Sequence, residues 1–118
     1  MDAPLTGIDW ESDDIRRRIA GGRRQPLARA CGLGSIRPLR LLDATGGYGR
    51  DAFVLAALGA EVTICERLPA LADGLRSAHQ RALESPALRD TAERMRVLAA
   101  DSIDVLRRSE TDHDVIYL

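Results

Sequence analysis

The hydrophobic positions of the chain fall into short apolar runs that alternate with longer segments of helical periodicity. Runs rich in leucine and β-branched residues are typical of strands. They predict strands at residues 40–42, 61–66, 95–100 and 114–118, and they allow a further short strand at 5–10. Acidic residues stand where the first three of these strands should end.

The segments between these runs carry the sequence signals of helix starts and stops. Pro26 and Pro69 stand in predicted first turns, Gly59 follows a predicted last turn, and Ser102 is a candidate N-cap. The signals predict helices at residues 25–31, 51–58, 70–83 and 103–108, with a short helical piece restarting at 85–86. The last helix is expected to turn its apolar side chains inward: Ile103, Val105 and Leu106. Alternating strands and helices predict an α/β fold, a parallel sheet with helices on both faces.

The length of 118 residues is enough for one small domain. We divide it into an arginine-rich lead-in with a short helix, residues 1–37, and a Rossmann-like half-domain, residues 38–118. The last predicted strand is as apolar as strands inside a sheet. An uncovered edge strand of this kind is prone to pair with other chains and aggregate. We therefore expect the fold to be incomplete at its C-terminus.

Charge is unevenly distributed, although the net charge is only −1. Acidic residues concentrate in residues 1–14, whereas residues 16–40 carry arginines with no acid among them. This stretch either binds RNA phosphates or is a solvated lead-in, and the sequence favours neither alternative. Cys31 and Cys65 have no metal-type spacing, and no signal peptide or membrane-length apolar run is present. The composition fits a cytoplasmic protein with free thiols, no bound metal and no membrane partner.

A glycine-rich turn joins the first predicted strand to the helix that follows it. Gly46, Gly47 and Gly49 permit positive φ and a close approach to a ligand, because glycine has no Cβ. Strand, glycine turn and helix together form the nucleotide-binding corner of an α/β sheet. The turn is therefore the candidate cofactor-binding loop.

The acidic strand ends lie where open α/β sheets bind their ligands. Glu66, after the second strand, can accept hydrogen bonds from a ribose diol. Asp101, after the third, can accept from an adenine amine, with the backbone N–H of Ser102 donating to a ring nitrogen. Asp43 lies beside the glycine turn, where a cationic amino-acid tail would rest. Structural alternatives stay open: a solvent-facing strand end for Glu66 and a helix-start acid for Asp101.

The same turn argues against a dinucleotide. A dinucleotide site has a third glycine and keeps the helix N-terminus free for a pyrophosphate. This turn lacks that glycine and places Asp51 at the helix start, where a carboxylate would repel phosphates or serve only as a partner of the helix dipole. Acidic strand ends and an anionic helix start fit a ligand with no phosphate and a cationic centre. S-adenosylmethionine (SAM) is such a ligand.

Residues 43–59 read Asp-Ala-Thr-Gly-Gly-Tyr-Gly-Arg-Asp-Ala-Phe-Val-Leu-Ala-Ala-Leu-Gly. This segment resembles the first motif of the bacterial 16S ribosomal RNA guanine-N2 methyltransferase family of the RsmJ type, from which Gly46 and Tyr48 depart. Residues 17–30 resemble the arginine-rich, Gly-Gly-containing lead-in of that family. Residues 65–69 resemble its Leu-Glu-Arg-Asn-Pro segment.

The resemblance continues to the end of the chain. Asp101 stands where the family often has serine, and residues 115–118 resemble the strand that leads into its Asp-Pro-Met-x-Pro motif. The family implies a class I methyltransferase fold with 16S ribosomal RNA or the small ribosomal subunit as partner. It implies SAM contacts at these residues: Arg50, Asp51, Glu66, Arg67, Asp101 and Ser102. Catalytic residues are expected just after Leu118, so the chain is expected to be an N-terminal fragment that is inactive alone.

Other functions stay open on the residues alone. The first is a class I methyltransferase that acts on a small molecule or a protein, which would differ in the motif after the last strand. The second is a non-catalytic module that binds an adenosine ligand or RNA. The weakest is an NAD-dependent oxidoreductase, which tight NADH binding without SAM binding would favour.

Overall fold

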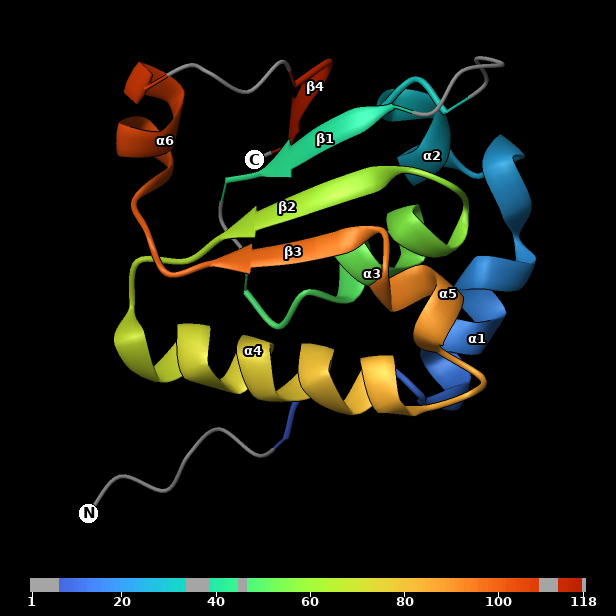
Figure 1. The fold of residues 1–118 in the computed structure, drawn as a ribbon. Helices are drawn as coiled ribbons and strands as arrows, with labels where there is room; N and C mark the ends of the chain where they lie inside the picture. Colours follow the sequence, from blue (N-terminus) through green and yellow to red (C-terminus); the bar gives the residue numbers. More distant parts are fainter. Residues whose placement is uncertain (1–6, 34–38, 45–46, 109–112, 118) are drawn as a thin grey trace.

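The computed structural model describes residues 7–33, 39–44, 47–108 and 113–117. Its centre is a sheet of four parallel strands in the order β3-β2-β1-β4 (Figure 1). The strands are β1 (Arg40–Asp43), β2 (Glu61–Cys65), β3 (Met95–Leu98) and β4 (Val115–Tyr117). The predicted α/β fold with a parallel sheet is confirmed, and each strand starts within one residue of its predicted position.

Helices precede β1 and connect the strands that follow it. They are α1 (Asp13–Ala20), the 3₁₀ helix η1 (Gly22–Arg24), α2 (Pro26–Ala30), α3 (Arg50–Ala57), α4 (Pro69–Glu84), α5 (Arg89–Ala92) and α6 (Ser102–Arg108). The connections through α3 and α4 step along the sheet in one direction, and the connection through α6 returns to the other edge. Because such crossovers are right-handed, α6 belongs to the face opposite α3 and α4.

One face of the sheet carries the core. Leu41, Val62 and Ile64 are buried beneath α3, which also buries its own residues 52–56. The α1 helix packs on the far side of α3, so α3 is covered from two sides and is apolar nearly all round. The core cluster contains residues from both sides of residue 37, and the proposed division into lead-in and half-domain stays a prediction.

The N-terminal segment differs from the expected strand. Residues 7–10 form no strand, and residues 5–6 lie outside the described residues. Ile8 and Trp10 are instead buried in the helical side of the core, where the Trp10 ring stacks on Phe53 at 5.3 Å between centroids. The indole N–H donates to the Tyr48 carbonyl oxygen at 2.9 Å. The apolar alternation was therefore a signal of side-chain packing and not of sheet pairing.

Sequence patterning also missed α1, although its start signal is present. The Ser12 hydroxyl accepts a hydrogen bond from the N–H of Ile15, and acidic residues occupy the first turn. At 85–86 no helix begins; α5 starts at Arg89 after a turn. The strand expected at 95–100 ends at Leu98.

The last helix does not pack its apolar residues inward. Ile103 is 56% exposed and Leu106 39%, and α6 buries none of its residues. Its cap also differs: Ser102 lies inside the helix, and the carboxylate of Asp101 accepts from the N–H of Ile103 at 2.9 Å. The helix signal was right, but the described part of the chain provides no surface for this apolar side.

This exposure has a measurable consequence. Ile103→Val will leave the free energy of unfolding of this chain within about 0.5 kcal/mol of the unsubstituted protein, because no buried contact is lost. The matched control is Ile64→Val, where the same truncation in a fully buried strand position costs about 1 kcal/mol. Urea unfolding followed by circular dichroism checks both. Equal losses would contradict the exposed position of α6.

Candidate functional site

Two buried carboxylates mark the carboxyl edge of the sheet. Asp43 is 3% exposed at the end of β1, and Glu66 is 8% exposed just after β2. In the described chain these are the only charged residues that are buried. Charged side chains are rarely buried unless hydrogen bonds or a function require it. The structure thus places the predicted strand-end acids together at one edge.

Glu66 is held in a defined orientation by the backbone around it. Its own N–H donates to the Leu98 carbonyl oxygen at 3.0 Å, which ties it to the end of β3. Its carboxylate oxygen Oε2 accepts from the N–H of Leu68 at 3.0 Å. The described residues place no donor on Oε1, so this oxygen can accept a hydrogen bond from a ligand.

The glycine turn has the backbone conformation that was expected of it. Gly47 has φ of 58° and Gly49 has φ of 70°, both in the left-handed region, whereas Gly46 lies outside the described residues. A Cβ on Gly49 would lie 3.0 Å from side-chain atoms of Leu75 and Trp10. The turn therefore packs tightly against the core, and α3 begins at the next residue, Arg50.

Asp51 is engaged from two directions, which the sequence did not indicate. The Arg18 guanidinium donates to Oδ1 and the Tyr117 hydroxyl donates to Oδ2, each at 2.5 Å. Partial burial acts to raise the pKa of Asp51, but the hydrogen bonds from Tyr117 and Arg18 outweigh it and lower the pKa. The anionic carboxylate joins α1, α3 and β4. The missed partners lie 33 and 66 residues away in the chain, beyond the range of local patterns.

The remaining predicted site residues occupy the rim. Arg50 and Arg67 are exposed, and the Arg50 guanidinium lies 5.7 Å from the centre of the Tyr48 ring. Asp101 and Ser102 are half-buried at the start of α6. Asp101 uses one carboxylate oxygen to cap that helix. The helix-start alternative for Asp101 is thus present in the structure, and a ligand contact would use its other oxygen.

The cysteine thiols report on the charge around the site. Burial raises the pKa of Cys65 to about 11, with Asp43 and Asp101 adding to the rise. Burial likewise raises the pKa of Cys31, with further contributions from Asp51 and Asp43. Both thiols therefore stay protonated near neutral pH, and neither is an activated nucleophile. The carboxylates that contribute to these shifts, Asp43, Asp51 and Asp101, also favour a cationic ligand.

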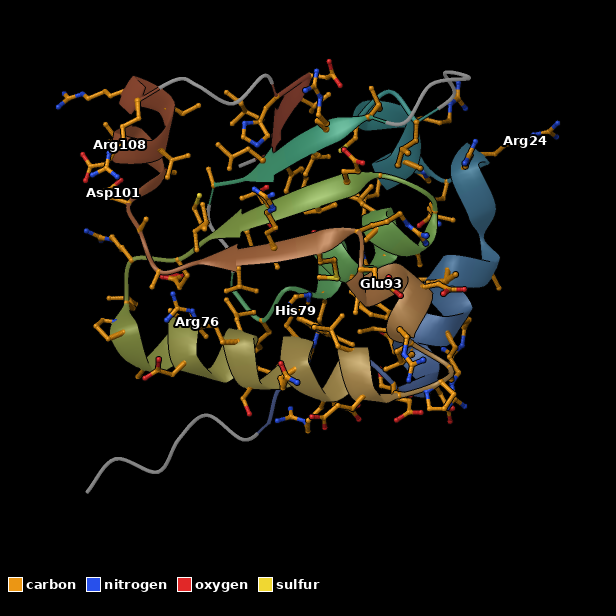
Figure 2. The ribbon with its side chains drawn as sticks, viewed as in Figure 1. Arg24, Arg76, His79, Glu93, Asp101 and Arg108 are labelled. Atoms are coloured by element: carbon orange, nitrogen blue, oxygen red, sulfur yellow. The ribbon has the colours of Figure 1, made fainter. Side chains whose placement is uncertain are left out.

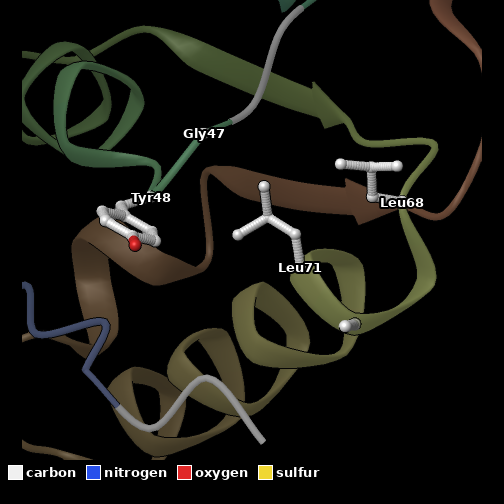
Figure 3. A pocket seen from close by; sticks show the side chains of 5 residues that line it. Gly47, Tyr48, Leu68 and Leu71 are labelled. Carbon is white, nitrogen blue, oxygen red and sulfur yellow. The ribbon is translucent and has the colours of Figure 1, made fainter. Parts of the chain in front are cut away.

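An apolar cavity of about 350 Å³ lies beside the glycine turn. It is lined by Gly47, Tyr48, Leu68, Ala70 and Leu71, and Figure 3 shows Leu71 projecting from α4 between Tyr48 and Leu68. Of the predicted site residues only Gly47 lines it. The cavity can receive an apolar part of a ligand, while the polar contacts come from the strand ends.

The comparisons with known proteins identify the family. A family model described as "Putative SAM-dependent methyltransferase" matches residues 5–118. The chain belongs to this family. Its cofactor is therefore SAM, and the site fits that molecule: two buried carboxylates and a left-handed glycine turn face the edge where a cationic, phosphate-free ligand would lie.

Curated relatives of the chain carry a common name. The chain is 49% identical over 105 residues to the Ribosomal RNA small subunit methyltransferase J of Laribacter hongkongensis, covering 87% of this chain and 37% of the relative. It is 44% identical over 124 residues to the protein of that name from Aeromonas salmonicida, covering 100% of this chain and 50% of the relative. The chain thus spans half or less of the length of these curated relatives.

A solved structure shows the same arrangement. The SAM-dependent methyltransferase NGO1261 from Neisseria gonorrhoeae matches with a TM-score of 0.76 and 34% sequence identity, over 94% of this chain and 46% of that one. The predicted methyltransferase fold is confirmed by this match. Within the described residues, no helix has the length and apolar content to cross a membrane.

Proposed function

We propose that this chain is the SAM-binding part of a cytoplasmic methyltransferase that modifies guanine N2 in 16S ribosomal RNA. Its relatives named Ribosomal RNA small subunit methyltransferase J support the ribosomal RNA substrate. The observation that carries the proposal is the pair of buried carboxylates, Asp43 and Glu66, beside a left-handed glycine turn. Burial of two acids on one sheet edge fits a ligand that brings hydroxyl donors and positive charge.

Each residue has a proposed role toward SAM. Glu66 accepts from the ribose hydroxyls through Oε1, because Leu68 already fixes Oε2. Asp101 accepts from the adenine amine, and the Ser102 N–H donates to a ring nitrogen. The backbone of Gly46, Gly47 and Gly49 allows close approach, and Asp43 faces the cationic amino-acid tail. Arg50 and Arg67 complete the rim, as the family resemblance implies.

Asp51 acts mainly through its neighbours in this proposal. Both of its carboxylate oxygens already accept short hydrogen bonds from Arg18 and Tyr117. It therefore fixes the start of α3 and the end of β4 around the donor site, and it adds negative charge near the sulfonium.

When bound, SAM supplies a methyl group on a positively charged sulfur. In the transfer a bond forms between the guanine amine nitrogen and the methyl carbon, the carbon–sulfur bond breaks, and its electron pair neutralises the sulfur. The amine then loses a proton. The protein contributes by holding the reacting atoms in line at near-attack distance. Residues 43–102 orient the donor side, and we propose that acceptors for the amine hydrogens lie in an Asp-Pro-Met-x-Pro loop after β4.

Titration calorimetry with SAM tests the donor site. Glu66→Gln should weaken SAM binding about tenfold, because a charged acceptor of the ribose hydroxyls becomes neutral. Glu61→Gln is the matched control: it makes the same change at the opposite, exposed end of β2 and should leave the affinity unchanged. NADH binding without SAM binding, or equal effects of the two substitutions, would overturn the proposed site. Small ribosomal subunits with labelled SAM then test whether this chain alone transfers the methyl group, and we expect no transfer.

A further inference from the structure

A second hollow runs along β3, the edge strand of the sheet in the described chain. It has a volume of about 450 Å³ and lies between α4 and β3. Arg76, His79 and Gln80 line it from α4, and residues 95–98 line it from β3. Figure 2 shows Arg76 and His79 rising from α4 toward β3, with Arg76 on the other side of the view from Arg24. We call this hollow the edge groove.

The edge groove has one arginine on α4 and one on the edge strand β3. Arg76 and Arg96 are exposed, and within the described residues neither guanidinium forms an ion pair or a hydrogen bond. The acids that lie closest in sequence, Asp73 and Glu93, are exposed and pair with neither arginine in the described structure. Met95 and Val97 face the core beneath α4, so strand alternation turns the Arg96 side chain to the other face of the sheet. The two guanidinium groups therefore flank the edge strand β3 from its two faces, and an anion that runs along this edge can reach both.

The floor of the edge groove contains polar groups in fixed positions. His79 donates from Nε2 to the Ala92 carbonyl oxygen at 2.8 Å, which holds its ring between α4 and α5. The carbonyls of Arg94 and Leu98 accept from β2, so the alternation of a parallel ladder turns the backbone N–H groups of Met95 and Val97 outward. The carbonyl groups of the same two residues also point outward, so the edge strand offers amide donors that alternate with acceptors.

The position of the edge groove relates it to the donor site. Its β3 wall ends at Leu98, and Asp101 of the proposed adenine contact follows three residues later. A polyanionic chain whose target nucleotide is held at the carboxyl edge of the sheet would have room to extend from there along β3. An extended acidic peptide fits less well, because β3 is only 4 residues long and offers few outward amides for strand addition.

We propose that the edge groove binds the sugar–phosphate backbone of the RNA substrate, with Arg76 and Arg96 as phosphate contacts. The inference rests on the proposed function, since it concerns the same substrate. Arginine is suited to this role because its planar guanidinium can donate two parallel hydrogen bonds to one phosphate. These contacts position the RNA and read no sequence.

Fluorescence anisotropy with a labelled single-stranded RNA tests the groove in the intact chain. The double variant Arg76→Glu/Arg96→Glu should bind the RNA at least about tenfold more weakly, because charged hydrogen bonds to phosphate are lost. The slope of log affinity against log salt should fall in magnitude by about 1.4, at about 0.7 for each lost contact on single strands. The matched control is Arg24→Glu/Arg29→Glu, the same charge change in the arginine-rich stretch, which should have the smaller effect.

Several outcomes separate this inference from the proposed function. Unchanged SAM binding by Arg76→Glu/Arg96→Glu, with weakened RNA binding, supports the edge groove. If the control pair loses the RNA and the groove pair does not, the RNA surface is the arginine-rich stretch and the inference is wrong. Retained SAM binding with no RNA binding by the unsubstituted chain also overturns it, while leaving the donor site intact. Binding of a polyglutamate peptide that depends on the groove arginines, without such dependence for RNA, would assign the groove to a protein partner.

Discussion

Gly49→Ala will lower the free energy of unfolding by about 3 kcal/mol, because strain and overpacking add at this position. Gly49 has φ of 70°, where a Cβ meets the following carbonyl oxygen. An added Cβ would also lie 3.0 Å from both Leu75 and Trp10 and 3.4 Å from Ile64. These neighbours belong to the buried core, so none can move into solvent to relieve the contact.

Gly22→Ala separates the two causes. Gly22 has nearly the same φ, 69°, but an added Cβ there meets nothing within 4 Å. Only the backbone term applies, so the loss should be about 1 kcal/mol. Urea unfolding by circular dichroism measures both, with fluorescence of the single tryptophan, Trp10, as a second probe. Equal losses at the two glycines would show that the core yields to the added methyl group and that the close packing of the turn is not a constraint.

The glycine substitution also connects stability to the donor site. Gly49 stands directly before α3 and sets the direction in which that helix leaves the end of β1. A shift of the turn to accommodate a Cβ would move the backbone that SAM is proposed to approach. Gly49→Ala is therefore expected to weaken SAM binding in calorimetry even under conditions where the variant is fully folded, whereas Gly22→Ala is not.

The contrast between the sheet and the Asp51 cluster explains what the sequence could predict. Strand and helix order follow from local patterns: apolar runs for β1 and β2, and prolines in the first turns of α2 and α4. The acidic strand ends follow from the same patterns, since the residue after a buried strand must reach the carboxyl edge. These predictions needed no knowledge of which elements touch.

Contacts between distant elements could not be predicted in the same way. The hydrogen bonds of Asp51 join residues of α1 and β4, and the stack of Trp10 on Phe53 joins the N-terminal segment to α3. An apolar residue in a short run carries no mark of whether it will pair in a sheet or pack against a helix. The exposed side of α6 is the converse case, where helical periodicity was present but the described chain offers no surface for it.

Breaking the Asp51 cluster should change both stability and titration. Asp51→Asn removes the negative charge to which both Arg18 and Tyr117 donate hydrogen bonds. It should lower the free energy of unfolding by about 1–2 kcal/mol at neutral pH. This is the lower range for charged hydrogen bonds, because the Arg18–Asp51 pair is partly exposed. The lowered pKa of Asp51 means that its contribution is fully present above the ordinary carboxyl pKa and is lost as pH falls through the lowered value. The free energy of unfolding of Asp51→Asn should therefore fall less steeply than that of the unsubstituted chain as pH is lowered through the acid range.

The Tyr117 hydroxyl in the same cluster should titrate at unusually high pH. Its hydrogen bond to Asp51, together with burial, raises the pKa of Tyr117 from 10.0 to about 12. A raised phenol pKa means that the stabilisation is fully present below 10.0 and is lost as pH rises toward about 12. Tyrosinate absorbance should show this late transition in the unsubstituted chain. It should disappear in Tyr117→Phe and move to lower pH in Asp51→Asn.

Tyr48→Phe is the matched control, because the chain has only two tyrosines and Tyr48 forms no side-chain hydrogen bond in the described structure. It should keep the late transition and the stability profile of the unsubstituted chain. A late transition that survives Asp51→Asn unchanged would mean that burial alone shifts Tyr117, and Asp51 would then not anchor β4. If the late transition does move in Asp51→Asn, the carboxylate in the first turn of α3 also fixes the end of β4. The donor site is then assembled only when α1, α3 and the sheet edge have come together.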